Sequence, residues 1–128
     1  SPSLAMHADG RTLAFGTPGG DQQDQWQLAF FLRHVHHGVN LQEAIDAPLF
    51  HTAHLQASFY PRDRRSAHLM AEPHFPHATL EALGQRGHLV EVAEPWTVGR
   101  LSAASHHPEG SLKAAATPRL MQAYAVGR

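Results

Sequence analysis

The segment from residue 12 to residue 20 constrains the fold more than any other part of the chain. Leu13 and Phe15 alternate with smaller or more polar neighbours, which is the period of a β-strand. The run Thr17-Pro18-Gly19-Gly20 ends the strand, and its glycines let the backbone turn with positive φ or approach a ligand closely. Because an apolar-rich segment starts at Trp26, the sequence predicts a strand that enters a helix through a glycine turn.

A turn of this kind has a chemical use. Backbone N–H groups without partners and the positive end of the helix dipole converge just after Gly20. That geometry binds anions, or the oxyanion that develops during acyl transfer. Pro-Gly-Gly is also a common tight turn with no chemistry, so the local residues alone leave both interpretations open.

The rest of the chain predicts helices and strands in mixed order. The predicted elements are a hairpin of residues 3–7 and 11–16 around Asp9-Gly10, a helix over 21–37, a short helix from Asn40 to Ala47, a short strand within 49–59, a strand at 67–71, a helix over 76–86, an edge-like strand at 88–94 and a hairpin of 97–105 with 111–116. Asp21 is predicted to cap the first helix, whose apolar residues span more than one face and predict that it is largely covered. We therefore expect an α+β fold and a single domain over residues 1–128.

Composition excludes several classes of protein. Charged residues make up 16% of the chain, below the usual share of about a quarter, which indicates surface that is normally buried against a partner. A net charge of −1 argues against nucleic-acid binding, which needs a basic face. The sequence has no apolar run of about 18 residues and therefore predicts no membrane span. It has no cysteine, which excludes disulfides and thiol chemistry.

The 12 histidines raise the question of a metal site. His34 and His37 share a helix face and could bind an ion with a third ligand. No carboxylate or further histidine stands at ligand spacing, so favourable placement at a helix C-terminus is the better explanation. We predict no metal site and no cofactor. The run Arg62-Asp63-Arg64-Arg65 is interpreted as a solvated loop, with a contact to a partner subunit as the alternative.

Several stretches occur in order along the whole chain and carry a family resemblance. They are Ser1-Pro2-Ser3-Leu4, the Asp9-Gly10 turn, Phe15-Gly16-Thr17-Pro18-Gly19-Gly20, Gly38-Val39-Asn40-Leu41-Gln42-Glu43-Ala44-Ile45-Asp46-Ala47-Pro48 and Gly87-His88. Together they resemble the C-terminal part of the small subunit of γ-glutamyltranspeptidases. The Asp-Gln-Gln after the double glycine and the ending, from Ala116-Thr117-Pro118-Arg119 to Gly127-Arg128, are similar to the acylase-like bacterial branch.

The resemblance implies a fold, an activity and a set of roles. The fold would be part of the αββα sandwich of an N-terminal nucleophile hydrolase. The activity would be transfer of a γ-glutamyl-type acyl group to water or an amine, by a Thr nucleophile that lies upstream of this chain. By the same resemblance, Gly19 and Gly20 supply the oxyanion donors and Asp21 and Gln22 contact the substrate.

The implied partners are the remainder of the small subunit, the large subunit and a small-molecule γ-glutamyl or related amide, and a homo-oligomer is compatible with them. The chain alone is expected to be inactive. The alternative is a non-catalytic interaction or binding domain that retains the fold, and a Thr at an upstream self-cleavage junction would distinguish the two. A periplasmic and a cytoplasmic location are both compatible with the sequence.

Overall fold

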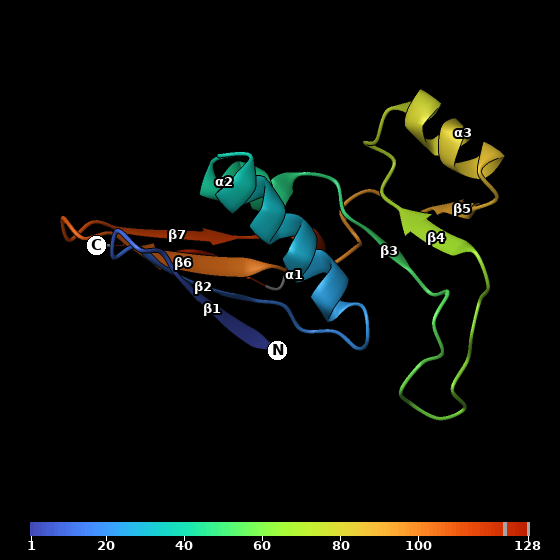
Figure 1. Ribbon diagram of the computed structural model, residues 1–128, viewed down its shortest axis with the longest axis horizontal. Coiled ribbons are helices and arrows are strands. Elements are labelled where there is room, and N and C mark those ends of the chain that lie inside the picture. Colours follow the sequence, from blue (N-terminus) through green and yellow to red (C-terminus); the bar gives the residue numbers. More distant parts are fainter. Residues whose placement is uncertain (122, 128) are drawn as a thin grey trace.

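The computed structural model describes residues 1–121 and 123–127 and contains both helices and strands (Figure 1). The elements in chain order are β1 (Pro2–Met6), β2 (Thr12–Gly16), α1 (Gln23–Phe31), a π-helical turn (Leu32–His36), α2 (Leu41–Asp46), β3 (Phe50–Thr52), β4 (His68–Ala71), α3 (His77–Gln85), β5 (Leu89–Val92), β6 (Ser102–His106), β7 (Leu112–Ala116) and a 3₁₀ turn (Arg119–Met121). The predicted α+β content is confirmed.

The larger sheet has the strand order β1-β2-β6-β7, and every neighbouring pair is antiparallel. Helices α1 and α2 lie on one face of it (Figure 1). Because side chains alternate along a strand, Leu13, Ala103 and Ala115 point toward the helices and are buried. At the β7 edge, the side-chain amide of Gln42 donates to the carbonyl of Ala116 at 3.0 Å and accepts from its N–H at 3.3 Å. This contact joins α2 to the edge strand.

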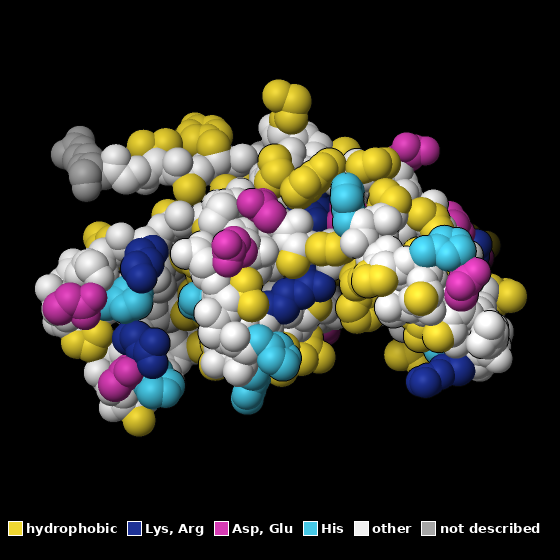
Figure 2. All heavy atoms as spheres, turned by 90° about the horizontal axis from the view of Figure 1, so that it is seen from above, with side chains coloured by type: hydrophobic (Ala, Val, Ile, Leu, Met, Phe, Trp, Pro, Cys, Tyr) yellow, Lys and Arg dark blue, Asp and Glu magenta, His cyan; other side chains and the backbone are white. Residues whose placement is uncertain are grey.

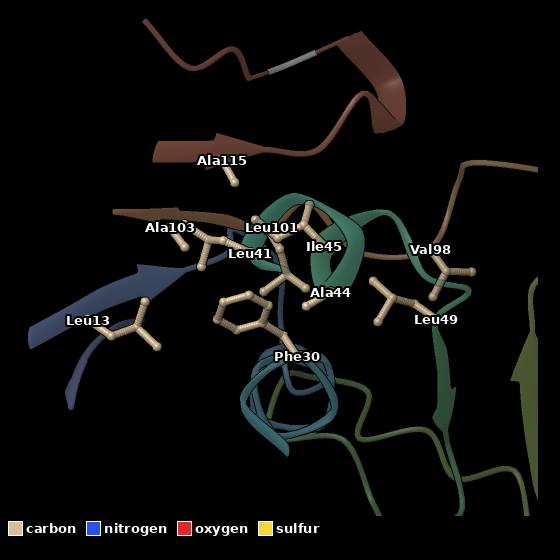
Figure 3. Close-up of a cluster of buried hydrophobic side chains, with 10 residues drawn as sticks. All are labelled: Leu13, Phe30, Leu41, Ala44, Ile45, Leu49, Val98, Leu101, Ala103 and Ala115. Carbon is tan, nitrogen blue, oxygen red and sulfur yellow. The ribbon is translucent and has the colours of Figure 1, made fainter. Parts of the chain in front are cut away.

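The core lies between the larger sheet and the two helices (Figure 3). Its members are Leu13, Phe30, Leu41, Ala44, Ile45, Leu49, Val98, Leu101, Ala103 and Ala115. Phe30 is fully buried, and the Phe15 ring lies 5.4 Å from its ring centroid and 5.8 Å from that of Phe31. Burial of one such large side chain contributes about 1.5–3 kcal/mol, so this layer of side chains fixes α1 and α2 to the sheet.

A second, smaller sheet has the order β3-β4-β5 and lies beyond the helices (Figure 1). β3 pairs antiparallel with β4, and β5 pairs parallel with β4 after the chain crosses over through α3. The side chain of Gln25 donates to the carbonyl of Thr52 at 3.0 Å and accepts from its N–H at 2.8 Å. The first turn of α1 is therefore attached to β3.

Two predictions about the elements need correction. The first helix begins at Gln23 and is not largely covered, because only one of its faces meets the sheet, while Leu28 is 57% exposed and Leu32 and Val35 are also exposed. The second hairpin starts at residue 102 instead of 97, because Gly99 has a φ of 77°, which strands do not adopt. The first hairpin, the three helices and the short strands lie where the sequence predicts them, within a few residues.

Charged and hydrophobic side chains are unevenly distributed over the face shown in Figure 2. Lys, Arg, Asp, Glu and His side chains gather at the left end of that view, which the turns of the two hairpins form, and hydrophobic side chains spread over much of the remainder. Within the part of the chain that the structure describes, no helix combines the length and hydropathy needed to cross a membrane.

Candidate functional site

The glycine turn between β2 and α1 begins at a buried threonine. Thr17 is 5% exposed, and its hydroxyl donates to the carbonyl of Pro18 at 2.9 Å. The same oxygen accepts from the backbone N–H of Arg100 at 3.1 Å. The loop that precedes β6 therefore fixes the start of the turn.

The two glycines of the turn have different requirements. Gly19 has a φ of 141°, and a Cβ at this position would lie 2.8 Å from Cζ3 of Trp26. Gly20 lies outside the left-handed region, and a Cβ there would meet Cε2 of Phe59 at 3.6 Å, which is an ordinary contact. The expectation of positive φ is therefore right for Gly19 and wrong for Gly20. A glycine is sterically required only at position 19.

The indole of Trp26 packs against the glycine turn. A Cβ on Gly99 would lie 3.3 Å from Cδ2 of Trp26 and 2.7 Å from Cδ1 of Leu49, so the indole lies between two close glycines, Gly19 and Gly99. Its Nε1 donates to Nδ1 of His51 at 3.3 Å. These contacts fix the ring, and the ring in turn fixes the backbone of the turn.

Backbone donors remain open at this turn. Within the described part of the chain, the N–H groups of Gly19, Gly20, Asp21 and Gln22 donate no backbone hydrogen bond. The carbonyl of Gln22 already accepts from the N–H groups one helical turn further on, at 3.1 and 3.2 Å. Open N–H groups at the positive end of a nine-residue helix are suited to an anion or an oxyanion.

The prediction that Asp21 caps α1 is wrong. The N-cap residue is Gln22, and no side chain caps the helix there. The Asp21 carboxylate instead accepts from the N–H of Ser58 at 2.7 Å and from the Ser58 hydroxyl. The hydrogen bond from the Ser58 hydroxyl has the larger effect and the one from its N–H the smaller, and together they hold the pKa of Asp21 below its ordinary value. Asp21 thus joins the turn to the loop that follows β3. The substrate contacts of Asp21 and Gln22 stay predictions.

Sequence reasoning missed a buried ion pair between Glu72 and Arg119. Nη2 of Arg119 lies 2.6 Å from Oε2 of Glu72, and both side chains are almost fully buried. Arg119 also donates to the carbonyls of Ile45 at 2.8 Å and Ala47 at 3.0 Å, and its guanidinium lies 5.0 Å from the ring centroid of Trp96. The pair ties the segment after β7 to the end of α2.

Glu72, the acidic partner of this pair, binds the backbone of two loops at the core. The Glu72 carboxylate accepts from the N–H of Leu49 at 3.0 Å and from that of Val98 at 3.2 Å. Burial alone would raise the pKa of Glu72, but the hydrogen bonds from Arg119 and from these two N–H groups outweigh it and lower the pKa. Val98 precedes Gly99, so Glu72 holds the loop that contacts Trp26.

The histidines do not converge on a metal site in the described residues, where no group of three or more His, Cys, Asp or Glu has metal-binding geometry. Nδ1 of His34 lies 2.8 Å from the carbonyl of Val39. His68 is buried on β4, and its Nε2 lies 2.8 Å from Oε2 of Glu91, which also accepts from Arg65.

Comparison with known proteins gives a consistent result. A family model described as Gamma-glutamyltranspeptidase matches residues 1–127. The oxamate amidohydrolase proenzyme of Klebsiella pneumoniae is 35% identical over 121 residues, which cover 93% of this chain and 22% of that protein. The chain therefore spans about a fifth of the length of this curated relative.

Solved structures agree with the sequence comparison. A structure described as LmbA2991HD is 49% identical with a TM-score of 0.92, and the match covers 99% of this chain and 23% of that one. The gamma-glutamyltranspeptidase of Pseudomonas nitroreducens complexed with L-DON has a TM-score of 0.72 at 22% identity, covering 100% of this chain and 60% of that one. At that identity the second match supports the fold alone.

Proposed function

The chain belongs to the gamma-glutamyltranspeptidase family, and on this premise we propose that it is the C-terminal part of the small subunit of an acyl-transferring enzyme. The enzyme would pass a γ-glutamyl-type acyl group to water or to an amine. A Thr nucleophile outside this chain would attack the carbonyl, and Gly19 and Gly20 would donate N–H groups to the resulting oxyanion.

The observation that carries the proposal is the set of open N–H groups on a rigid turn. Donors stabilise a transition state best when they are fixed before the reaction begins, because no reorganisation is then needed. Here Trp26 and Thr17 fix the turn from two sides. The first N–H groups of any helix lack intrahelical partners, and here they belong to a turn that Trp26 and Thr17 support.

A partner in the complete protein is supported by the outer face of the larger sheet. Leu4, Ala14, Ala104 and Ala114 are neighbours across its four strands, and all are exposed. Their small, apolar surface is suited to packing against a second sheet, as two-sheet sandwiches require. We propose that the remainder of the small subunit supplies that sheet and completes an αββα sandwich.

The proposed large subunit has a separate support in α1. Leu28 of α1 and Leu32 and Val35 of the π-helical turn form an exposed apolar stripe at helical spacing. We propose that the large subunit covers this stripe. Exposed apolar stripes of this kind are typical of interaction surfaces.

A pair of glycine variants in the full-length, matured protein tests the proposed catalytic role. Gly19→Ala should slow single-turnover acylation about 100-fold, at the scale of one lost oxyanion donor, because the added Cβ must displace Trp26 or the turn. Gly84→Ala is the matched control and should change acylation by less than about threefold, because Gly84 lies in α3, has no positive φ and has nothing within 4 Å of an added Cβ.

Circular dichroism and subunit stoichiometry would confirm that both variants fold and assemble. Near-normal acylation by a folded Gly19→Ala enzyme would remove this turn from the mechanism.

A further inference from the structure

The loop that follows β3 is built as a closed unit beside the glycine turn. Its ends meet where the N–H of Arg65 donates to the carbonyl of Ala53 at 3.0 Å. Inside it, the N–H of Ala57 donates to the carbonyl of Asp63 at 2.9 Å. Compact loops whose ends lie close together are frequently functional. We call residues 53–65 the aromatic loop, after Phe59 and Tyr60 at its tip.

Asp21 attaches the aromatic loop to the glycine turn. Its carboxylate accepts from both the N–H and the hydroxyl of Ser58, one residue before Phe59. A carboxylate that accepts two hydrogen bonds from one residue sets the orientation of that residue as well as its distance. The position of Phe59 relative to the turn therefore depends on Asp21.

Phe59 lies beside the glycine turn. Its Cε2 is 3.6 Å from the Cβ position of Gly20, yet the side chain as a whole is 67% exposed. One edge of the ring thus lies beside the turn, at the distance an added methyl would bridge, while much of its surface faces outward. A group bonded to a carbonyl that occupies the Gly19 and Gly20 N–H groups would lie within van der Waals reach of this ring.

We propose that Phe59 is a specificity-determining residue that packs against an apolar or aromatic acyl group next to the scissile carbonyl. The inference rests on the acyl-transfer function proposed above. An aromatic surface of this size contributes most to an apolar or aromatic partner and little to the charged end of a γ-glutamyl group. The enzyme should therefore favour amides of apolar carboxylic acids, and Asp21 acts as the positioning residue for Phe59.

The test compares two substrates that share one leaving group. Phenylacetyl-4-nitroanilide and γ-glutamyl-4-nitroanilide differ only in the acyl part, so the ratio of their kcat/KM values isolates the acyl contact. In the full-length, matured protein, Phe59→Ala should lower the phenylacetyl to γ-glutamyl ratio roughly tenfold, and Phe59→Leu should lower it less. Tyr60→Ala is the matched control, because Tyr60 is 94% exposed in the same loop, and it should leave the ratio unchanged.

A second variant tests the positioning role. Asp21→Ala should lower the same ratio in the same direction and should speed hydrogen exchange at the Ser58 N–H, whereas Phe59→Ala should leave that exchange slow. A variant that merely destabilised the protein would speed exchange at many amides and move both kcat/KM values together.

The outcomes separate the inference from its premise. Turnover with a ratio that Phe59→Ala does not change, or an equal loss on both substrates, would refute the role of Phe59 alone. Loss of subunit assembly without a change in the ratio would assign Phe59 to an interface and would also refute it. No turnover of any amide by the matured wild-type protein would refute the proposed function, and the inference with it.

Discussion

Arg119→Met should destabilise the protein far more than loss of an exposed arginine. The substitution removes a buried partner and leaves the Glu72 carboxylate charged in a site from which water is excluded. Breaking a buried ion pair from one side typically costs about 3–5 kcal/mol. The carbonyl of Ile45 loses its Arg119 donor as well, and an unsatisfied buried group adds about 1–3 kcal/mol, whereas the carbonyl of Ala47 keeps a hydrogen bond from Arg33 at 3.4 Å. We expect a loss of at least about 3 kcal/mol in the free energy of local opening.

Native-state hydrogen exchange at the Leu49 and Val98 N–H groups measures this loss where it arises, because both groups donate to Glu72. The matched control is Arg65→Met, which breaks a pair with Glu91 whose two side chains are 59% and 45% exposed. The control should cost less than about 1 kcal/mol. Equal effects of the two substitutions would refute the argument that burial gives the Glu72–Arg119 pair its weight.

The Glu72–Arg119 pair also predicts how the stability of the protein changes with pH. The pKa of Glu72 is lower in the folded protein than in the unfolded chain. The stability it contributes is therefore complete above the unfolded-state pKa and is lost as the pH falls through the lower, folded-state pKa. Glu72→Gln should remove this acid dependence from exchange at Val98. Retention of the full acid dependence in that variant would assign it to another group.

Two further substitutions test the support of the turn. Gly99→Ala should destabilise the protein by about 1–3 kcal/mol more than Gly38→Ala in urea unfolding. Both glycines have positive φ, but only the Cβ at position 99 would overlap Leu49. Equal costs of the two substitutions would contradict the steric reasoning. The protection of the Ser58 N–H, taken relative to the intrinsic exchange rate at each pH, should fall as the pH falls from the ordinary pKa of aspartate through the lowered pKa of Asp21, and Asp21→Asn should remove this fall. A fall in protection that persists in Asp21→Asn would exclude Asp21 as its source.

Much of the local structure was predictable from short-range signals. The alternation at Leu13 and Phe15 and the Asp9-Gly10 turn define the first hairpin, and both are local properties of the chain. Asn40 caps α2, its side chain accepting from the N–H of Gln42 at 2.9 Å. Such features depend on neighbours within a few residues, and sequence reasoning reaches them.

The contacts that hold the candidate site were not predictable in the same way. Glu72 and Arg119 are 47 positions apart, and nothing near either residue indicates that both are buried. Asp21 had a plausible local role as a helix cap, but a residue 37 positions away provides both of its donors. Tertiary contacts thus replaced the local preference. The roles of Gly19 and Gly20 in catalysis stay predictions.

The position of the indole between two glycines has a consequence for how this sequence can change. Gly19 and Gly99 are 80 positions apart, yet a side chain at either position would crowd the same ring, and at position 99 it would also overlap Leu49. A smaller residue in place of Trp26 would relieve the crowding at position 19 and part of it at position 99, where Leu49 remains, so alanine at position 19 would become easier to accommodate beside leucine at position 26. The three positions should therefore vary together in evolution, and the effect of any one substitution among them depends on the identity of the other two.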